Sequence, residues 1–368
     1  MRFNSFFAEY ERTTLNGFLK TNKVRNKEEK FSKSDVLSVS GELGVINQIE
    51  HLGRSYAGES VALYHILRTG QIVYTKSPLA ESPYGIIKLN RNEDGIVSTL
   101  YAVYDVLNKA DCRYIEHYFA YKPRLNNYLR PIVRIGAKHD MKIGNDEVLK
   151  NYVNFPSKEE QQKISDFLDL INQRIDTQNK IIEKCKSLIN QIRHVIELKY
   201  SEAQKTSLFE LCSIKTGKKD ANKSSQNGKY PFFTCGRETL SIDTYSFEGK
   251  ALLVSGNGEI GQVKYYDGKF DAYQRTYVLQ NFSIKPKYIK IWLEILLPKI
   301  IEKEKNVGAM PYIVVSTLAN IKIPKFDTKY EDNLISLFQA FENKVQDCEI
   351  TLKLYRKQKD FFLCNLFI

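Results

Sequence analysis

Residues 158–200 read KEEQQKISDFLDLINQRIDTQNKIIEKCKSLINQIRHVIELKY, and this stretch decides the fold of the chain. No glycine or proline interrupts it, and Pro156 stands just before it. Ser157 followed by Glu160 has the spacing of a capping box, which predicts that a helix begins here. A helix of roughly 43 residues would be about 65 Å long, far longer than a compact domain needs.

Apolar side chains recur along this stretch in two columns spaced by seven residues. The columns are Ile164, Ile171, Gln178, Cys185 and Ile192, and Leu168, Ile175, Ile182, Ile189 and Ile196. Filled a and d positions over several heptads predict a coiled coil. Gln178 is the one polar member of the seam: it either fixes the helix register, is a tolerated defect, or faces a partner.

A second helix of the same kind is predicted 170 positions later, again after a proline, Pro324. Its columns are Leu334, Phe341, Cys348, Tyr355 and Phe362, and Phe338, Val345, Leu352, Lys359 and Leu366. Neither helix can bury its apolar stripe alone, so we expect the two to pair. The residues expected to make the pairing are Ile164, Leu168, Ile171, Ile175, Ile182, Ile189, Leu334, Phe338, Phe341, Val345 and Leu352.

The repeat continues upstream of the helices. RYIEHYF at 113–119 corresponds to KYIKIWL at 287–293, and Thr14-Leu-Asn-Gly-Phe-Leu resembles Ser207-Leu-Phe-Glu-Leu-Cys. Gly136-Ala137 likewise corresponds to Gly308-Ala309. A long period with few copies indicates a duplicated domain.

The segments between these anchors favour β-structure. Short β-branched and aromatic runs punctuated by Gly, Asn and Asp predict strands at 71–75, 84–89, 95–104, 251–255, 261–266 and 276–279, with helices near 112–122 and 286–305. We therefore expect an α+β protein in which two β-rich domains, 1–155 and 201–324, alternate with long helices at 156–200 and 325–368.

Composition favours a polyanionic partner. The 368 residues carry a formal charge of +12, and 42% are apolar, enough for real cores. Nucleic acid is the first candidate, a membrane surface the second, and a basic protein with no special partner the plain alternative. Because no long apolar run or secretory signal is found, we expect a cytoplasmic chain with no membrane contact. The six cysteines show no CxxC pair, so neither a disulfide framework nor a metal site is expected.

Motifs for catalysis are missing. Gly256, Gly258, Gly261 and Val263 form GxGxxGxV, but 262–268 is expected to be a strand entering a turn, not a phosphate-binding helix. A glycine-rich loop between strands, close to a DNA backbone, is the interpretation we favour. The aromatic-proline motif of DNA methyltransferases, a Pro-Asp nuclease motif and a P-loop are all absent from the sequence. We expect no catalytic residue and no cofactor of the chain's own.

The segment Pro156-Ser-Lys-Glu-Glu-Gln-Gln-Lys-Ile-Ser-Asp-Phe-Leu resembles the start of the spacer helix in specificity subunits of type I restriction-modification systems. The layout of two divergent domains and two similar helices resembles that family over the whole chain. The second copy, from Pro324 to Phe338, keeps the proline and the apolar positions, but has Lys329-Tyr-Glu-Asp-Asn in place of the Glu-Gln pair.

The resemblance implies two target recognition domains that each bind half of a bipartite double-stranded DNA site. The helices would pair antiparallel and set the gap between the half-sites. Two modification subunits carrying S-adenosylmethionine, and restriction subunits for cleavage, would be the partners of a non-catalytic chain. The alternatives are the recognition subunit of a type IIB-like restriction-methylation enzyme and a non-catalytic coiled-coil interaction scaffold.

Basic and polar loop residues are the candidates for DNA contact, because Lys holds phosphates while Arg, Gln and Asn also reach base edges. They are Lys23, Arg25, Arg54, Tyr56, Lys76, Ser77 and Tyr84 in the first half, and Lys218, Lys219, Arg237, Asn257, Tyr273, Gln274 and Arg275 in the second. Tyr273-Gln-Arg-Thr is the best single candidate. We expect Ser77–Tyr84 to be its counterpart.

Overall fold

The computed structural model describes residues 2–3, 6, 9–79, 81–135, 141–304 and 312–367. The chain divides into two compact units, Met1–Asn179 with Thr351–Ile368, and Lys180–Ile350. The two long helices, α4 (Lys158–Leu198) and α8 (Thr328–Asn365), contribute residues to both units.

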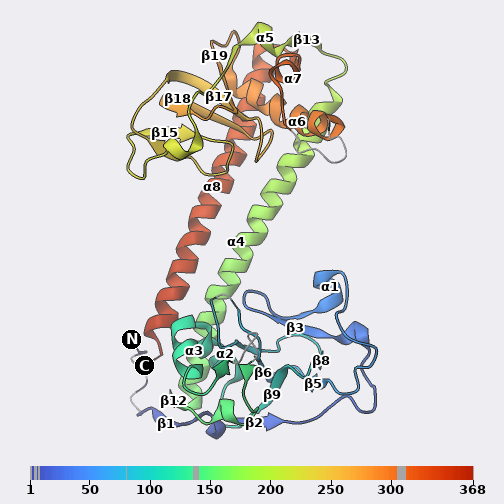
Figure 1. Ribbon diagram of the computed structural model, residues 1–368, viewed down its shortest axis with the longest axis vertical. Helices are drawn as coiled ribbons and strands as arrows, with labels where there is room; N and C mark the ends of the chain where they lie inside the picture. Colours follow the sequence, from blue (N-terminus) through green and yellow to red (C-terminus); the bar gives the residue numbers. More distant parts are fainter. Residues whose placement is uncertain are drawn as a thin grey trace. The chain divides into compact units, whose positions relative to one another are not determined.

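The first unit is built around a four-stranded sheet with the strand order β2-β9-β6-β7. Figure 1 labels β2, β6 and β9 of this sheet. Its strands are β1 (Glu11–Thr14), β2 (Leu19–Asn22), β3 (Leu37–Ser40), β4 (Gly44–Asn47), β5 (His65–Leu67), β6 (Ile72–Thr75), β7 (Ile87–Leu89), β8 (Gly95–Val97), β9 (Tyr101–Val106), β10 (Arg134–Ile135), β11 (Met141–Lys142) and β12 (Tyr152–Phe155). The helices are α1 (Gln48–Leu52), α2 (Cys112–Ala120) and α3 (Lys122–Leu129). Buried Tyr114 and Tyr118 of α2 pack on Phe155 with ring centroids 5.0 and 4.9 Å apart, which fixes α2 against the end of the domain.

The second unit is built around a six-stranded sheet with the order β14-β19-β17-β18-β15-β16. Its strands are β13 (Gln204–Ser207), β14 (Ser213–Thr216), β15 (Tyr230–Phe233), β16 (Leu240–Ile242), β17 (Phe247–Ser255), β18 (Val263–Ala272), β19 (Thr276–Gln280) and β20 (Lys322–Lys325). The helices are α5 (Leu208–Leu211), α6 (Pro286–Glu304) and α7 (Val315–Ala319). Trp292 of α6, the single tryptophan of the chain, is fully buried in this unit's core.

Strand pairing reveals the duplication directly. In the first unit β1 pairs antiparallel with β12, and Glu11 lies opposite Phe155. In the second unit β13 pairs antiparallel with β20, and Gln204 lies opposite Lys325. These positions differ by 193 and 170, the offsets that relate the two halves of the sequence. Each unit is therefore closed by the same terminal strand pair.

The long helices pair antiparallel within each unit. In the first unit Phe167 of α4 meets Phe362 of α8 with ring centroids 4.7 Å apart. In the second unit Lys186 pairs with Glu349 at 3.1 Å, and the guanidinium of Arg193 lies over the ring of Phe338. Every position of the two pairs of heptad columns is buried or half-buried, Gln178 included. The predicted α+β fold class is confirmed.

Some expected elements differ. The strand predicted at 95–104 is two strands, because the chain turns at 98–100 and β8 and β9 join different sheets. The helix predicted near 112–122 ends at Ala120, and a second helix follows around Pro123. The turn expected at the end of 262–268 is wrong, since β18 runs on and Gly268 pairs with Gly249. The Gly136-Ala137 and Gly308-Ala309 correspondence lies outside the described residues.

Within the described ranges, no helix combines the length and the apolar character that crossing a membrane requires.

Candidate nucleic-acid interface

The best candidate segment, Tyr273–Arg275, is a tight turn between β18 and β19. The Thr276 N–H donates to the Tyr273 carbonyl at 2.8 Å and closes the turn. The Gly256 N–H donates to the Arg275 carbonyl at 3.0 Å, so the turn lies against the glycine-rich loop. The Gln274 and Arg275 side chains are exposed, and Tyr273 is half-buried.

Two further loops, one after β14 and one after β15, lie beside the turn and the glycine-rich loop. The Gln274 N–H donates to the Lys219 carbonyl, and its Nε2 donates to Asp220, both at 3.0 Å. The Glu259 N–H donates to the Cys235 carbonyl at 2.9 Å, and the Glu259 carboxylate pairs with Arg237 at 3.1 Å. The structure thus brings together all seven candidates of the second half, which are Lys218, Lys219, Arg237, Asn257, Tyr273, Gln274 and Arg275.

The GxGxxGxV segment is the connection between β17 and β18, and strand β18 follows it. Gly258 and Gly261 have φ of +61° and +77°, which side chains rarely adopt. A Cβ on Gly256 would lie 2.6 Å from the Arg275 carbonyl oxygen. Gly256 therefore serves the close approach of this loop to the turn, whereas Gly258 and Gly261 supply backbone conformations that the loop needs.

Beside the turn lies an open depression of about 380 Å³. Gln274 and Arg275 form one wall, and the rest is mostly apolar, with Tyr277, Ile313 and Val314. The Tyr277 hydroxyl donates to the Ile313 carbonyl at 2.7 Å, which holds the opposite wall in place. A polar and cationic edge above an apolar surface can accept both the edge and the face of a base.

The candidates of the first half are less concentrated. Arg25 donates to the Leu63 carbonyl and Lys76 to Asn145, both at 2.6 Å. Arg25 forms a β-bridge with His65. Burial lowers the pKa of His65, and the charges of Arg25 and Lys76 lower it further. His65, which begins strand β5, was not among the predicted site residues. Nothing in its immediate sequence marks it, because Arg25 and Lys76 are distant along the chain.

The other candidates of the first half differ in exposure and packing. Arg54 stacks over Tyr56 at 4.7 Å, and Tyr56 is 61% exposed. Ser77 is exposed, whereas Tyr84 is half-buried and packs on the core of the first unit. Lys23 is exposed and directly follows β2.

The expected correspondence between Ser77–Tyr84 and Tyr273–Thr276 is wrong. Thr75 pairs with Tyr101 in the first sheet, as Ser255 pairs with Thr276 in the second. Residues 76 and 77 therefore correspond to 256 and 257 in the glycine-rich loop. The segment that corresponds to Tyr273–Arg275 is 98–100.

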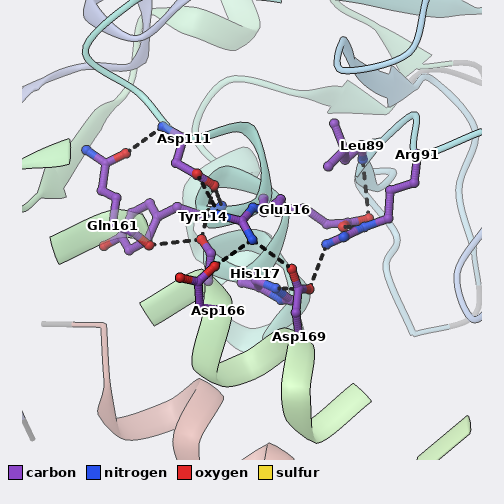
Figure 2. A network of polar contacts seen from close by, with 11 residues as sticks. Leu89, Arg91, Asp111, Tyr114, Glu116, His117, Gln161, Asp166 and Asp169 are labelled. Carbon is purple, nitrogen blue, oxygen red and sulfur yellow. Dashed lines mark hydrogen bonds and ion pairs between the residues drawn. The ribbon is translucent and has the colours of Figure 1, made fainter. Parts of the chain in front are cut away.

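A buried polar network joins the first domain to α4 (Figure 2). Gln161 is fully buried: its Oε1 accepts from the Asp111 N–H, and its Nε2 donates to the Pro156 carbonyl, both at 2.9 Å. Asp111 in turn caps α2 by accepting the Tyr114 N–H at 3.0 Å. The Glu-Gln segment that carried the resemblance is thus the attachment of α4 to the domain.

The preceding Glu160 serves a different contact. Ser157 Oγ accepts the Glu160 N–H at 3.4 Å, which is one half of the predicted capping box. The Glu160 carboxylate accepts hydrogen bonds from Arg2 and Tyr10, at 2.8 and 3.3 Å. The carboxylate therefore ties the start of the chain to α4.

Charged side chains extend this network along α4. Arg113 pairs with Asp166 at 2.7 Å, and Asp169 accepts from Arg91 and His117 at 3.0 and 2.9 Å (Figure 2). Burial alone would raise the pKa of Asp169, but the hydrogen bond from His117 and the charge of Arg91 bring it down to about 2. In the second unit, Lys287 and Gln339 stand at the positions equivalent to Arg113 and Asp169 and are joined at 2.5 Å.

Comparison with known proteins points to one family. The family model described as the type I restriction modification DNA specificity domain matches residues 200–335. The matched residues contain the turn Tyr273–Arg275 and all seven candidates of the second half.

Relatives of known class extend the match. The EcoDI specificity subunit of Escherichia coli is 33% identical over 165 residues, which are 43% of this chain and 37% of that protein. The MpnII specificity subunit of Mycoplasma pneumoniae is 25% identical over 170 residues, 43% of this chain and 51% of that protein. The chain thus aligns with about a third to a half of the length of these two relatives.

The fold of the chain matches a solved structure. The type I S subunit from M. genitalium superposes with a TM-score of 0.65 over 98% of this chain and 96% of that one, at 15% identity. The predicted resemblance to type I specificity subunits is confirmed in sequence and in fold.

Proposed function

We propose that this chain is the DNA specificity subunit of a type I restriction-modification complex. It recognises a bipartite double-stranded DNA target, one half-site per recognition domain, and the paired helices set the gap. The observation that carries the proposal is the duplicated terminal strand pair, which gives two copies of one domain, of which the second lies within the matched specificity domain.

The chemistry in this proposal belongs to partners. Two modification subunits would carry S-adenosylmethionine and methylate the target, and restriction subunits would cleave DNA. Since its target is DNA inside the cell, we place the complex in the cytoplasm. The cationic loops around the turn Tyr273–Arg275, and Arg25 with Lys76 in the first unit, support DNA as the ligand because they combine phosphate-binding and base-reading groups.

A pull-down of the tagged chain from its source cells, followed by mass spectrometry, tests this assignment. Recovery of a separate S-adenosylmethionine-dependent methyltransferase, near two copies per chain, supports it. Recovery of one protein that both methylates and cleaves would favour the type IIB-like alternative. Binding of DNA that is uniform across sequences and lost in moderate salt, with no methyltransferase recovered, would favour the scaffold and contradict the proposal.

A further inference from the structure

The turns 98–100 and 273–275 have the same hydrogen bonds at equivalent places in the two domains. The Tyr101 N–H donates to the Ser98 carbonyl at 3.0 Å, as the Thr276 N–H donates to the Tyr273 carbonyl at 2.8 Å. The Lys76 N–H donates to the Leu100 carbonyl at 3.0 Å, as the Gly256 N–H donates to the Arg275 carbonyl at 3.0 Å. With the strand registers, these bonds place Leu100 where the other domain has Arg275.

The two side chains at this position share exposure and differ in chemistry. Leu100 is 57% exposed, although its neighbours Ala102 and Val103 are fully buried. Arg275 is exposed, and its guanidinium forms no ion pair with any residue in the described ranges. An exposed leucine beside the basic residue Lys76 contributes little to folding. Leu100 is suited to contact an apolar group on a polyanionic ligand that Lys76 attracts.

We propose that Leu100 and Arg275 are equivalent specificity-determining residues, which read one base pair each in opposite half-sites. This inference rests on the proposed function. Arg275 would donate two hydrogen bonds to O6 and N7 of a guanine, and Leu100 would contact the C5 methyl group of a thymine. The depression beside Arg275 leaves its side chain room to reach a base edge.

The test uses the full chain purified with the methyltransferase that co-purifies with it, and a library of random DNA duplexes selected and sequenced. Arg275→Leu should lose a guanine preference at one position of one half-site, by about 5- to 150-fold. Leu100→Arg should change one position of the other half-site from thymine toward guanine. Arg275→Lys should keep the affinity for bulk DNA and weaken the guanine preference less than Arg275→Leu does, because a lysine ammonium can still donate to guanine but lacks the rigid, planar donor pair of the guanidinium.

Leu43→Arg is the matched control, because Leu43 is 56% exposed in the same unit and lies in the turn between β3 and β4. It should leave the selected sequence unchanged. If Leu100→Arg or Arg275→Leu selects the same DNA sequence as the wild type, the inference is overturned. A loss of affinity that is uniform across DNA sequences also overturns it, because such a loss would indicate phosphate contacts. If the wild-type complex itself selects no bipartite sequence, the proposed function fails instead, so the two failures are distinguishable.

Discussion

Gln161→Ala should loosen the attachment of α4 to the first domain. The substitution leaves the Asp111 N–H and the Pro156 carbonyl without their partner, and both hydrogen bonds are buried. Each unpaired buried group costs about 1–3 kcal/mol, so the loss of two partners should lower the free energy of opening at this junction by about 2–6 kcal/mol. Because Asp111 also caps α2, the loss should reach Asp111–Ala120.

Hydrogen exchange followed by mass spectrometry measures this effect locally. Amides of Asp111–Ala120 should exchange at least about 30-fold faster in the variant, the factor that 2 kcal/mol gives. Gln162→Ala is the control, since Gln162 is the neighbouring glutamine and is exposed. The buried helix Pro286–Glu304 of the second unit serves as internal reference. Equal exchange at 111–120 in the two variants would refute the reasoning.

Three further outcomes are expected. The pKa of Asp169 in the folded chain lies below its ordinary value, so the ionised carboxylate stabilises the fold above about pH 4, and this contribution is lost as the pH falls toward 2. Asp169→Asn should therefore lower the free energy of unfolding of the first unit by about 1–2 kcal/mol at neutral pH. A denaturation series that shows the same deficit at pH 2 would contradict this. Ile182→Ala should weaken helix pairing in the second unit by about 2–3 kcal/mol in thermal or urea unfolding, whereas Leu188→Ala, at a position 37% exposed, should stay within about 0.5 kcal/mol. Lys218→Ala should weaken DNA binding equally across sequences and reduce the slope of log affinity against log salt concentration by about 1, as measured in salt titrations with several DNA sequences. A loss of affinity for some sequences only would instead indicate that Lys218 contacts a base.

Predictions made from periodic patterns in the sequence agree with the structure. The heptad columns, the two anchors at Thr14 and Ser207, and helix 286–304 follow from local spacing, and the structure contains them. The turn at 98–100 could not be predicted, because Ser98-Thr-Leu contains no Gly, Pro, Asn or Asp that would mark a turn. Only the pairing of β8 and β9 with different sheets divides the run. Gln161 was visible as part of a motif, but two of its partners, Asp111 and Lys109, lie about fifty positions away in the sequence.

The candidate site followed a similar division. In the second half, the seven residues chosen for charge and polarity lie in loops that follow β14, β15, β17 and β18. In the first half, Tyr84 was chosen for its place in a polar run, yet it packs on the core, because the segment after β6 turns back toward the sheet at Gly85. Leu100 carried no polar signal at all, and only comparison of the two domains draws attention to it.

The terminal strand pair has a consequence for how such a chain changes over generations. The first and last strands of each domain are paired, with Glu11 opposite Phe155 and Gln204 opposite Lys325. The segment between these two strands therefore begins and ends at the same place in the fold. A gene segment encoding 15–151 or 208–321 could be exchanged for another of different length without altering the helix that follows. The roughly twenty additional residues of the first copy show that the two strand pairs already tolerate such a difference. If each domain binds its own half-site, as proposed, a lineage could acquire a new target by recombination within one domain while the long helices stay unchanged.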